Sequence, residues 1–369
     1  MTVERISMTQ FRNYESRTFE FHPKMNVIVG LNGVGKTNIL DAIYYLCLGK
    51  SYFSSLDKMV IMQDADFFRL EGIFKKGYDQ DKVVIKSKSG SRKEIAISGK
   101  VLSKISEHIG RFLCVIISPD DVQMMLDGSE VRRNFVNNTI IQTDGTYLED
   151  LMLYGALLKR RNALLKTFAD KNSFDKILLE SVTAPMYEPA QRIFERREKF
   201  VHQMNPIFAE TYGEISGHQE VCSIIYHSQM QKASLRELVM KSLDKDKILA
   251  RSTQGIHKDD LIFTMNGEPL KYFASQGQLK SFILALKITQ YKLLEANSGQ
   301  KPILLLDDIF DKLDKNRVLQ LLNMLMDKNF GQVFITDTDS ERISSILNTI
   351  GYDYQLLTIA SNSVENNNP

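Results

Sequence analysis

The segment GLNGVGKTN, residues 30–38, is the feature that most constrains this chain. It fits the pattern G-x-x-x-x-G-K-[ST], in which glycines allow backbone N–H groups to surround phosphates. The preceding MNVIVG predicts a buried strand, and the following NILDAIYYLCLG has helical periodicity. A strand that runs through a glycine-rich loop into a helix is the context in which such a loop binds phosphate. The sequence therefore predicts a nucleotide-binding loop.

Each residue of this loop is a candidate nucleotide contact, and two of them have more specific roles. Lys36 would reach the β- and γ-phosphates and is a candidate catalytic residue, and the Thr37 hydroxyl would occupy a Mg²⁺ position. The glycines permit a close backbone approach and positive φ angles. The predicted contacts are Gly30, Leu31, Asn32, Gly33, Val34, Gly35, Lys36, Thr37 and Asn38.

A second candidate element is the apolar strand PILLLDD, residues 302–308. A buried strand that ends in acids places carboxylates at the edge of a sheet where phosphate loops also lie. Asp307 is predicted to hold Mg²⁺, and Asp308 is a candidate catalytic residue that would polarise an attacking water. We expect this strand and the phosphate loop to lie side by side in one parallel sheet.

A third element is SQGQ, residues 275–278, at the start of a long predicted helix. Taken alone, Ser275 is simply a good N-cap, although a helix N-terminus that begins with serine and glycine also suits an anion. The order of phosphate loop, helical insertion, S-x-G-Q and acidic strand resembles that of ABC-type ATPases. The resemblance implies that Ser275, Gly277 and Gln278 contact the γ-phosphate of a nucleotide held by a second subunit. It also places DKLD, which ends at Asp314, at the D-loop position.

The secondary-structure pattern predicts an α/β fold of two lobes, with β-rich chain ends around a helical middle. The first lobe would be an ATPase lobe with a mixed or parallel sheet, made by residues 1–118 and 290–360. The second would be a mainly helical lobe, residues 119–289, with the S-x-G-Q motif and a β-hairpin of LIFTMN and PLKYFA around Asn266-Gly267. The polar tail, residues 361–369, is expected to be disordered.

Composition argues against several other classes of protein. The net charge is +2, so no global basic field indicates nucleic acid, although a local basic face is still compatible. The three cysteines are far apart and suggest neither a disulfide framework nor a zinc site. The N-terminus does not read as a signal peptide, and no apolar run approaches the roughly 20 residues of a membrane span. We therefore expect a cytoplasmic protein without a membrane partner.

Further motifs narrow the resemblance. In addition to the three elements above, the chain contains in order FRNY, GKSYF, ISPDD, VRRNF and GIHKDD. Together they resemble the RecF family of bacterial recombination mediators, which are related to the ABC-type heads of SMC and Rad50 proteins. FRNY, ISPDD with the arginine pair that follows it, and GIHKDD are the parts that point to this family. The similarity extends from Thr2 to about Ile359.

The resemblance implies an ATP- and Mg²⁺-dependent homodimer that binds DNA, both single-stranded and gapped duplex. Such proteins act with RecO and RecR to load RecA at single-strand gaps in DNA repair and replication-fork maintenance, and they hydrolyse ATP slowly. This would place the protein at the nucleoid. The resemblance also implies that Arg12 and Asn13 of FRNY touch the nucleotide near its phosphates.

Alternatives to these assignments stay open at the level of sequence. An SMC or Rad50 fragment would need long heptad segments, an OLD-family nuclease would need an appended domain, and a transporter ATPase would need a switch histidine. ABC ATPases commonly have a glutamine after the strand that in this chain reads LCVIIS. Here the chain continues with SPDD, and Gln123 follows several residues later, so the residue at the glutamine position stays open. His257 either reaches the edge of the active site or is a structural histidine. ATP could also serve as a dimer glue that is barely hydrolysed.

The DNA-contacting residues are the least constrained part of the site. Basic residues at helical spacing are candidates, but the same pattern describes a solvated helix face with i,i+4 ion pairs. The candidates are Arg132, Arg133, Lys159, Arg160 and Arg161, followed by Arg192, Arg196 and Arg197.

Overall fold

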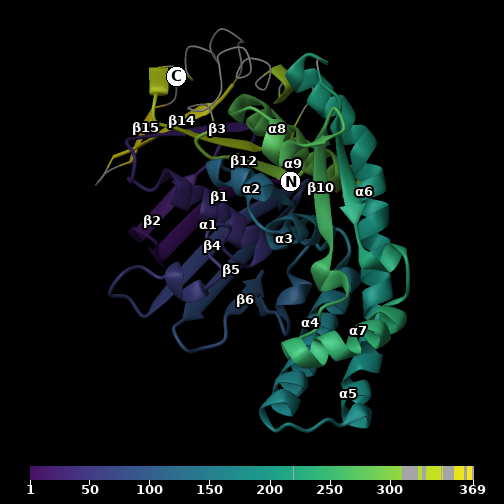
Figure 1. The fold of residues 1–369 in the computed structure, drawn as a ribbon. Helices are drawn as coiled ribbons and strands as arrows, with labels where there is room; N and C mark the ends of the chain where they lie inside the picture. Colours follow the sequence, from purple (N-terminus) through teal and green to yellow (C-terminus); the bar gives the residue numbers. More distant parts are fainter. Residues whose placement is uncertain are drawn as a thin grey trace. The chain divides into compact units, whose positions relative to one another are not determined.

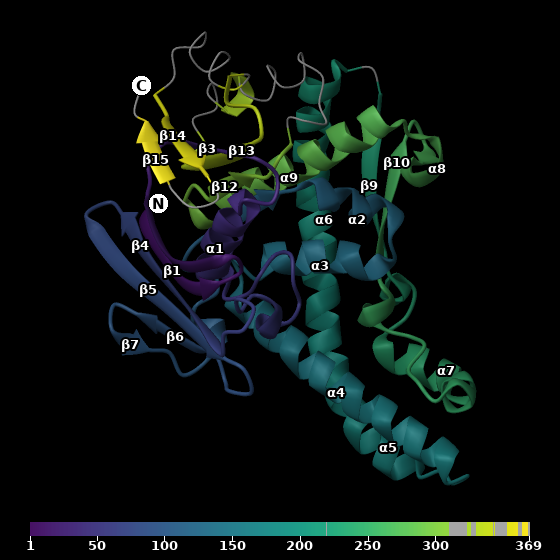
Figure 2. The same ribbon diagram turned by 90° about the vertical axis from the view of Figure 1, so that its left-hand side faces the viewer.

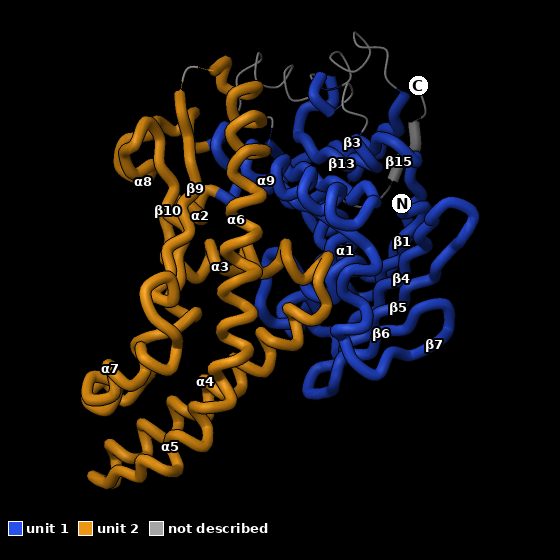
Figure 3. Tube along the Cα trace, turned by 90° about the vertical axis from the view of Figure 1, so that its right-hand side faces the viewer, with its two compact units in different colours: residues 1–121, 280–369 blue, residues 122–279 orange. Residues whose placement is uncertain are grey.

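The computed structural model describes residues 1–218, 220–309, 323–325, 330–341, 343, 353–360 and 364–367. The chain divides into two compact units, coloured separately in Figure 3. Unit 1 combines Met1–Asp121 with Lys280–Pro369, and unit 2 is Val122–Leu279. Both ends of the chain therefore build the same unit.

The central sheet of unit 1 has the strand order β15-β14-β3-β13-β12-β8 (Figure 1). All neighbouring pairs are parallel except β14 and β15. The strands β3, β8, β12 and β13 are buried on both faces, which explains their predominantly apolar sequences. The strands are β3 (Met25–Val29), β8 (Cys114–Ile117), β12 (Ile303–Leu306), β13 (Val333–Asp337), β14 (Gln355–Ile359) and β15 (Val364–Asn367).

Two expectations need correction here. The loop strand β3 and the acidic strand β12 do lie in one parallel sheet, but β13 lies between them. Strand periodicity reports burial and carries no information on strand order, so it could not reveal this neighbour. The tail expected to be disordered contributes Val364–Asn367 as an edge strand antiparallel to β14. Backbone pairing to an existing sheet edge does not require apolar side chains.

The second sheet of unit 1 is antiparallel, in the order β2-β1-β4-β5-β6-β7 (Figure 2). Helix α1 (Lys36–Leu48), which follows the phosphate loop, contacts strands of both sheets, and nearly all of its residues are buried. This helix therefore joins the two sheets in one hydrophobic core. The antiparallel strands are β1 (Thr2–Phe11), β2 (Tyr14–Glu20), β4 (Phe67–Lys76), β5 (Asp79–Lys88), β6 (Glu94–Ile97) and β7 (Lys100–Val101).

Unit 2 is mainly helical and contains a small antiparallel sheet in the order β11-β10-β9. Its long helices α4 and α6 pack against each other (Figure 2). The helices are α2 (Gln123–Leu126), α3 (Ser129–Ile140), α4 (Gly145–Asp170), α5 (Lys176–Thr183), α6 (Tyr187–Ser216), α7 (Leu235–Leu249) and α8 (Leu270–Phe273). The strands are β9 (Cys222–His227), β10 (Asp260–Met265) and β11 (Glu268–Pro269). Helix α9 (Gln276–Ser298) begins in unit 2 and continues into unit 1.

The hairpin predicted around Asn266-Gly267 forms, but its second strand is short. Only Glu268–Pro269 pairs with β10, and Leu270–Phe273 is helical. Proline has no N–H to donate to a strand ladder, so Pro269 limits the pairing. The principal partner of β10 is instead β9, within a stretch expected to be helical. The β-branched and aromatic residues of CSIIYH are the sequence signal that could have identified this strand.

Short 3₁₀ turns connect several of these elements. They span Asp57–Met59, Ile105–Glu107, Pro119–Val122, Ala184–Met186, Gln229–Gln231 and Ile256–Lys258. In the described part of the chain, no helix has the length and apolar character that crossing a membrane demands.

Candidate nucleotide-binding site

The loop between β3 and α1 has the backbone geometry of a phosphate cradle. Gly33 and Gly35 have φ angles of 83° and 110°, which side chains other than glycine rarely adopt. A Cβ on Gly35 would lie 2.6 Å from the Nδ2 atom of Asn13, and one on Gly30 would lie 2.4 Å from the Ile359 carbonyl oxygen. Glycine is therefore needed for space at Gly30, for conformation at Gly33 and for both at Gly35.

Lys36 is the first residue of α1, and its side chain turns back over the loop. Its Nζ donates to the carbonyl oxygens of Gly30 at 2.7 Å and Leu31 at 3.1 Å. The ammonium group is thereby held at the loop, where a phosphate would meet it together with the N-terminus of α1. This geometry agrees with the phosphate-binding role that the sequence predicts for Lys36.

The phosphate loop and the acidic strand meet at Thr37 and Asp307. The Thr37 hydroxyl donates to the two carboxylate oxygens of Asp307 at 2.9 and 3.1 Å. Thr336, at the end of β13, donates to the same carboxylate at 2.8 Å. A hydroxyl and a carboxylate at one point are hard oxygen donors of the kind that Mg²⁺ prefers, so these residues fit the ion that the sequence predicts.

Asp308 lies in a sharp turn directly after β12. Its φ angle is 47°, a left-handed conformation that aspartate tolerates better than most residues. Its backbone N–H donates to the Thr336 hydroxyl at 2.9 Å. Thr336 therefore bridges the two acids, donating to the first and accepting from the second. Thr336 can orient both acids because β13 lies next to β12, and the sequence did not reveal this strand order.

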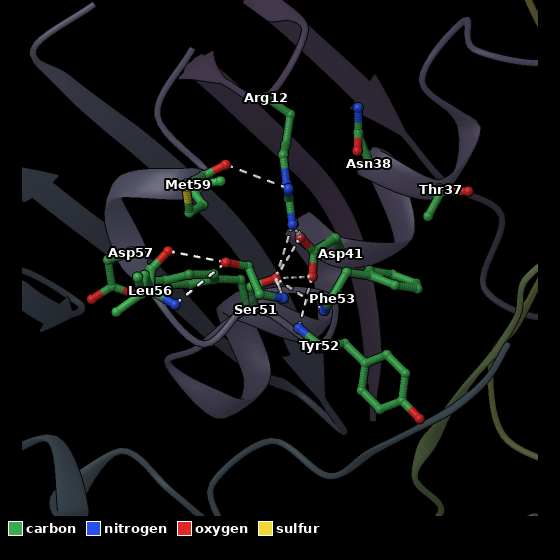
Figure 4. A network of polar contacts seen from close by, with 12 residues as sticks. Arg12, Thr37, Asn38, Asp41, Ser51, Tyr52, Phe53, Leu56, Asp57 and Met59 are labelled. Carbon is green, nitrogen blue, oxygen red and sulfur yellow. Dashed lines mark hydrogen bonds and ion pairs between the residues drawn. The ribbon is translucent and has the colours of Figure 1, made fainter. Parts of the chain in front are cut away.

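The FRNY motif supports the loop and its helix (Figure 4). The Arg12 guanidinium forms an ion pair with Asp41 of α1 at 2.8 Å and also donates to Ser51. Ser51 donates in turn to both carboxylate oxygens of Asp41. Arg12, expected to lie near the phosphates, is thus engaged with the second turn of α1. Asp41 and Ser51 were not identified from sequence, although GKSYF marks the segment that returns to this helix.

Asn13 braces the loop more directly than Arg12 does. Its Nδ2 donates to the Val34 carbonyl at 3.0 Å, and its Oδ1 accepts from Asn38 at 2.7 Å. The Tyr14 hydroxyl donates to the Gly35 carbonyl. Direct contact of Arg12 and Asn13 with the nucleotide stays a prediction. Asn13 hydrogen-bonds to the backbone of the loop, and Arg12 hydrogen-bonds to the Met59 carbonyl.

The S-x-G-Q motif forms the N-terminus of α9 in unit 2. The backbone N–H of Ser275 donates to the Gln278 side chain at 2.7 Å, and that of Gln278 donates to the Ser275 hydroxyl at 3.2 Å. This is a reciprocal helix cap. Gln278 also donates to Glu220. Ser275 is exposed, so the cap leaves it accessible, and the nucleotide contacts of Ser275, Gly277 and Gln278 stay predictions. The D-loop assignment lies outside the described residues.

Three of the arginines among the DNA candidates are engaged inside unit 2. Arg161 is fully buried and forms an ion pair with Asp246 at 2.8 Å, so its assignment as a DNA contact was wrong. Its position on the inner face of α4 could not be read from a run of three basic residues. Arg132 forms a two-pronged pair with Asp260, and Arg133 donates to the Asp259 carbonyl.

Ion pairing also accounts for the arginines of α6. Arg192 and Arg196 both contact Asp150 of α4, and Arg197 is buried against Asp259. The alternative interpretation, a helix face with ion pairs, therefore describes these arginines better than DNA contact does. The partners of Arg192 and Arg196 lie on the neighbouring helix α4 as well as on α6. Lys159 and Arg160 are exposed and stay candidates for DNA contact.

His257 of GIHKDD has a structural environment. Its Nδ1 atom lies 2.8 Å from the Tyr154 hydroxyl, and its Nε2 atom lies 3.3 Å from the Ser252 carbonyl oxygen. Burial lowers the pKa of His257 to about 4, so the imidazole is neutral at physiological pH. These contacts favour the structural role over an active-site role.

Comparison with known proteins assigns the family. The model described as RecF/RecN/SMC N terminal domain matches residues 2–356. The DNA replication and repair protein RecF of Flavobacterium johnsoniae is 40% identical over 97% of this chain and 100% of its own length. The protein of the same name from Cytophaga hutchinsonii is 38% identical over 100% of this chain and 98% of its own. The chain belongs to the RecF family.

Solved structures agree with this assignment. A structure described as the recombination mediator protein RecF-ATP in the RecFOR pathway superposes with a TM-score of 0.90 at 29% identity, covering 99% of this chain and 97% of its own. An SMC head bound to the C-winged helix domain of ScpA gives a TM-score of 0.59 at 13% identity, covering 100% and 97%. The latter shows the fold alone. The predicted ABC-type ATPase head and the resemblance to RecF-family DNA replication and repair proteins are both confirmed.

Substitution of Asp307 by asparagine tests the electrostatics of the site in a RecF-family chain. Burial raises the pKa of Asp307 above its ordinary 3.8 despite hydrogen bonds from Thr336 and Thr37. The folded state therefore binds a proton here more readily than the unfolded chain, so stability falls as pH rises through the window between the unfolded and the raised folded pKa. Asparagine removes this penalty. We expect nucleotide-free Asp307→Asn to melt about 2 °C above wild type at pH 7, with the difference vanishing below the unfolded pKa.

The measurement is a thermal melt at several pH values, repeated with ATP and Mg²⁺. Wild type should gain stability from ATP with Mg²⁺, whereas Asp307→Asn should gain little beyond what metal-free ATP provides. A melting temperature of the nucleotide-free variant below that of wild type at pH 7 would contradict the electrostatic argument.

Proposed function

We propose that this chain is an ATP-gated DNA-binding mediator of recombinational repair and replication-fork maintenance. ATP would bind the loop formed by residues 30–38, with Mg²⁺ between Thr37 and Asp307. The observation that carries this proposal is the hydrogen bond from Thr37 to Asp307, because it brings together two motifs from opposite ends of the chain. The solved RecF relative described with ATP supports the same ligand.

ATP would drive formation of a homodimer. The cap Ser275–Gln278, in which Ser275 is exposed, presents the N-terminus of a long helix, a site suited to a γ-phosphate. In the proposed dimer this cap meets the nucleotide held by the second copy, so neither copy has a complete site alone. Asp308 would orient the attacking water for slow hydrolysis.

The dimer would hold DNA, both single-stranded and gapped duplex, and would help load RecA together with RecO and RecR. Lys159 and Arg160 supply exposed positive charge on α4 for phosphate contacts. The protein would act in the cytoplasm, at the nucleoid. The description of the solved relative as a recombination mediator of the RecFOR pathway supports RecO and RecR as partners.

Light scattering tests the dimer. Wild type should have the mass of a monomer without nucleotide and of a dimer with ATP and Mg²⁺. Ser275→Arg should bind ATP as wild type does but stay monomeric, because a bulky cation replaces the small cap at the expected contact. Arg160→Ser, an exposed change in the same unit, serves as the control and should dimerise normally. Dimerisation of Ser275→Arg at wild-type concentrations would refute the role of the cap.

A further inference from the structure

The strand β8 ends beside the acids of the nucleotide site. Ile117 pairs with Leu306 of β12, and the Asp307 N–H donates to the Ile117 carbonyl at 2.8 Å, which extends the ladder. Ser118 is therefore the neighbour of Asp307 on one side, and Thr336 is its neighbour on the other. Residues in register on parallel strands share a face, so the three form one polar row at the carboxyl edge of the sheet.

The two hydroxyl residues of this row differ in one respect. Thr336 donates to Asp307 and accepts from the backbone of Asp308. Ser118 is only 4% exposed, yet its Oγ atom has no hydrogen-bond partner in the part of the chain that the structure describes. Buried polar atoms are ordinarily satisfied by protein, water or ligand. The Ser118 hydroxyl is thus available on the side of Asp307 that Thr336 does not occupy.

A buried ion pair fixes the backbone that carries this hydroxyl. Asp121 accepts from the Ser118 N–H at 2.7 Å, and its carboxylate lies 2.8 Å from the Lys287 ammonium. Lys287 also donates to the Ile116 carbonyl at 2.9 Å and lies almost fully buried on α9. Tyr52 hydrogen-bonds to both Asp121 and Lys287. The end of β8 and the residue that follows it are therefore held in place by charge-assisted contacts within unit 1.

We propose that the Ser118 hydroxyl binds a water molecule of the Mg²⁺ hydration shell, opposite Thr336, and so orients the metal held by Thr37 and Asp307. Mg²⁺ retains several waters when it binds proteins and phosphates, and groups that orient its ligands contribute to metal affinity. Gln123, the glutamine considered for the position after this strand, is exposed and belongs to unit 2. Ser118 supplies the polar group at that strand end instead. The inference rests on the proposed ATP and Mg²⁺ site.

The test compares Ser118→Ala, Ser118→Thr and the control Ser87→Ala, which removes a buried hydroxyl from β5 of the other sheet. Binding of a fluorescent ATP analogue is titrated with Mg²⁺ and, separately, measured in excess chelator. Ser118→Ala should raise the half-saturating Mg²⁺ concentration about tenfold while leaving the metal-free affinity unchanged. Ser118→Thr should restore the wild-type value, and Ser87→Ala should match wild type.

Melting of the nucleotide-free variants separates a local effect from a folding defect. Ser118→Ala removes an unsatisfied hydroxyl and should melt at or above the wild-type temperature. An unchanged Mg²⁺ requirement in Ser118→Ala would overturn the inference, and so would an equal loss of metal-free affinity. If wild type bound the analogue equally well with Mg²⁺ and with chelator, the proposed metal site itself would be refuted. This result concerns wild type alone and is therefore distinguishable from a failure of the Ser118 inference.

Discussion

Replacement of Lys36 by methionine should weaken ATP binding strongly while the fold survives. The Lys36 ammonium is already positioned over the loop by the Gly30 and Leu31 carbonyls, so a phosphate meets a preset charge. Methionine keeps most of the buried stem but removes the charge and all three donors. Charge-assisted hydrogen bonds contribute roughly 1.5–3 kcal/mol each, so we expect affinity to fall by at least about 100-fold.

Isothermal titration with ATP and Mg²⁺ measures this loss. Lys76→Met, at the exposed end of β4, removes the same charge from the same unit and should bind as wild type. Circular dichroism should give matching spectra for all three proteins. A Lys36→Met affinity within threefold of wild type would show that the ammonium does not meet the phosphates.

Replacement of Arg161 by leucine destabilises unit 2 severely. Arg161 and Asp246 are both almost fully buried, and Arg161 also donates to Ser252 and Thr183. The substitution leaves the Asp246 carboxylate buried without its compensating charge. Removing one partner of a buried pair ordinarily costs about 3–5 kcal/mol. We therefore expect chemical denaturation of unit 2 at much lower denaturant concentration than in wild type.

The adjacent Arg160 provides a matched control. Arg160→Leu is exposed and should leave stability within about 0.5 kcal/mol of wild type while weakening DNA binding. The double variant Arg161→Leu/Asp246→Leu should recover much of the lost stability, because no buried charge is then unpaired. Wild-type stability of Arg161→Leu would disprove the structural role and return this residue to the DNA candidates.

The sequence predicted the phosphate loop because its function requires a local pattern. Glycine spacing, Lys36 and Thr37 all lie within nine residues, and the strand and helix on either side have strong periodicity. Asp307 could be predicted in the same way, since it directly follows a strongly apolar strand. The paired motifs therefore allowed the nucleotide site to be assigned before any tertiary contact was known.

Contacts between distant segments were not predictable in the same way. The bridging role of Thr336 depends on β13 lying next to β12, and that of Asp41 depends on its pairing with Arg12. Charge runs misled for a related reason. Lys159, Arg160 and Arg161 are all basic, so the sequence does not distinguish them. The helix turns by about 100° per residue, however, and this rotation places Arg161 on the buried face of α4.

The strand order of the central sheet also has a consequence for synthesis on the ribosome. Strand β3 emerges among the first thirty residues, but its two neighbours, β13 and β14, belong to residues 333–359. Until those segments leave the exit tunnel, a strand that is fully buried in the folded protein and the loop that follows it have no sheet to enter. The nucleotide site therefore assembles only after β13 and β14 have emerged, and a nascent chain that stops short of β13 exposes β3 to chaperones and to aggregation.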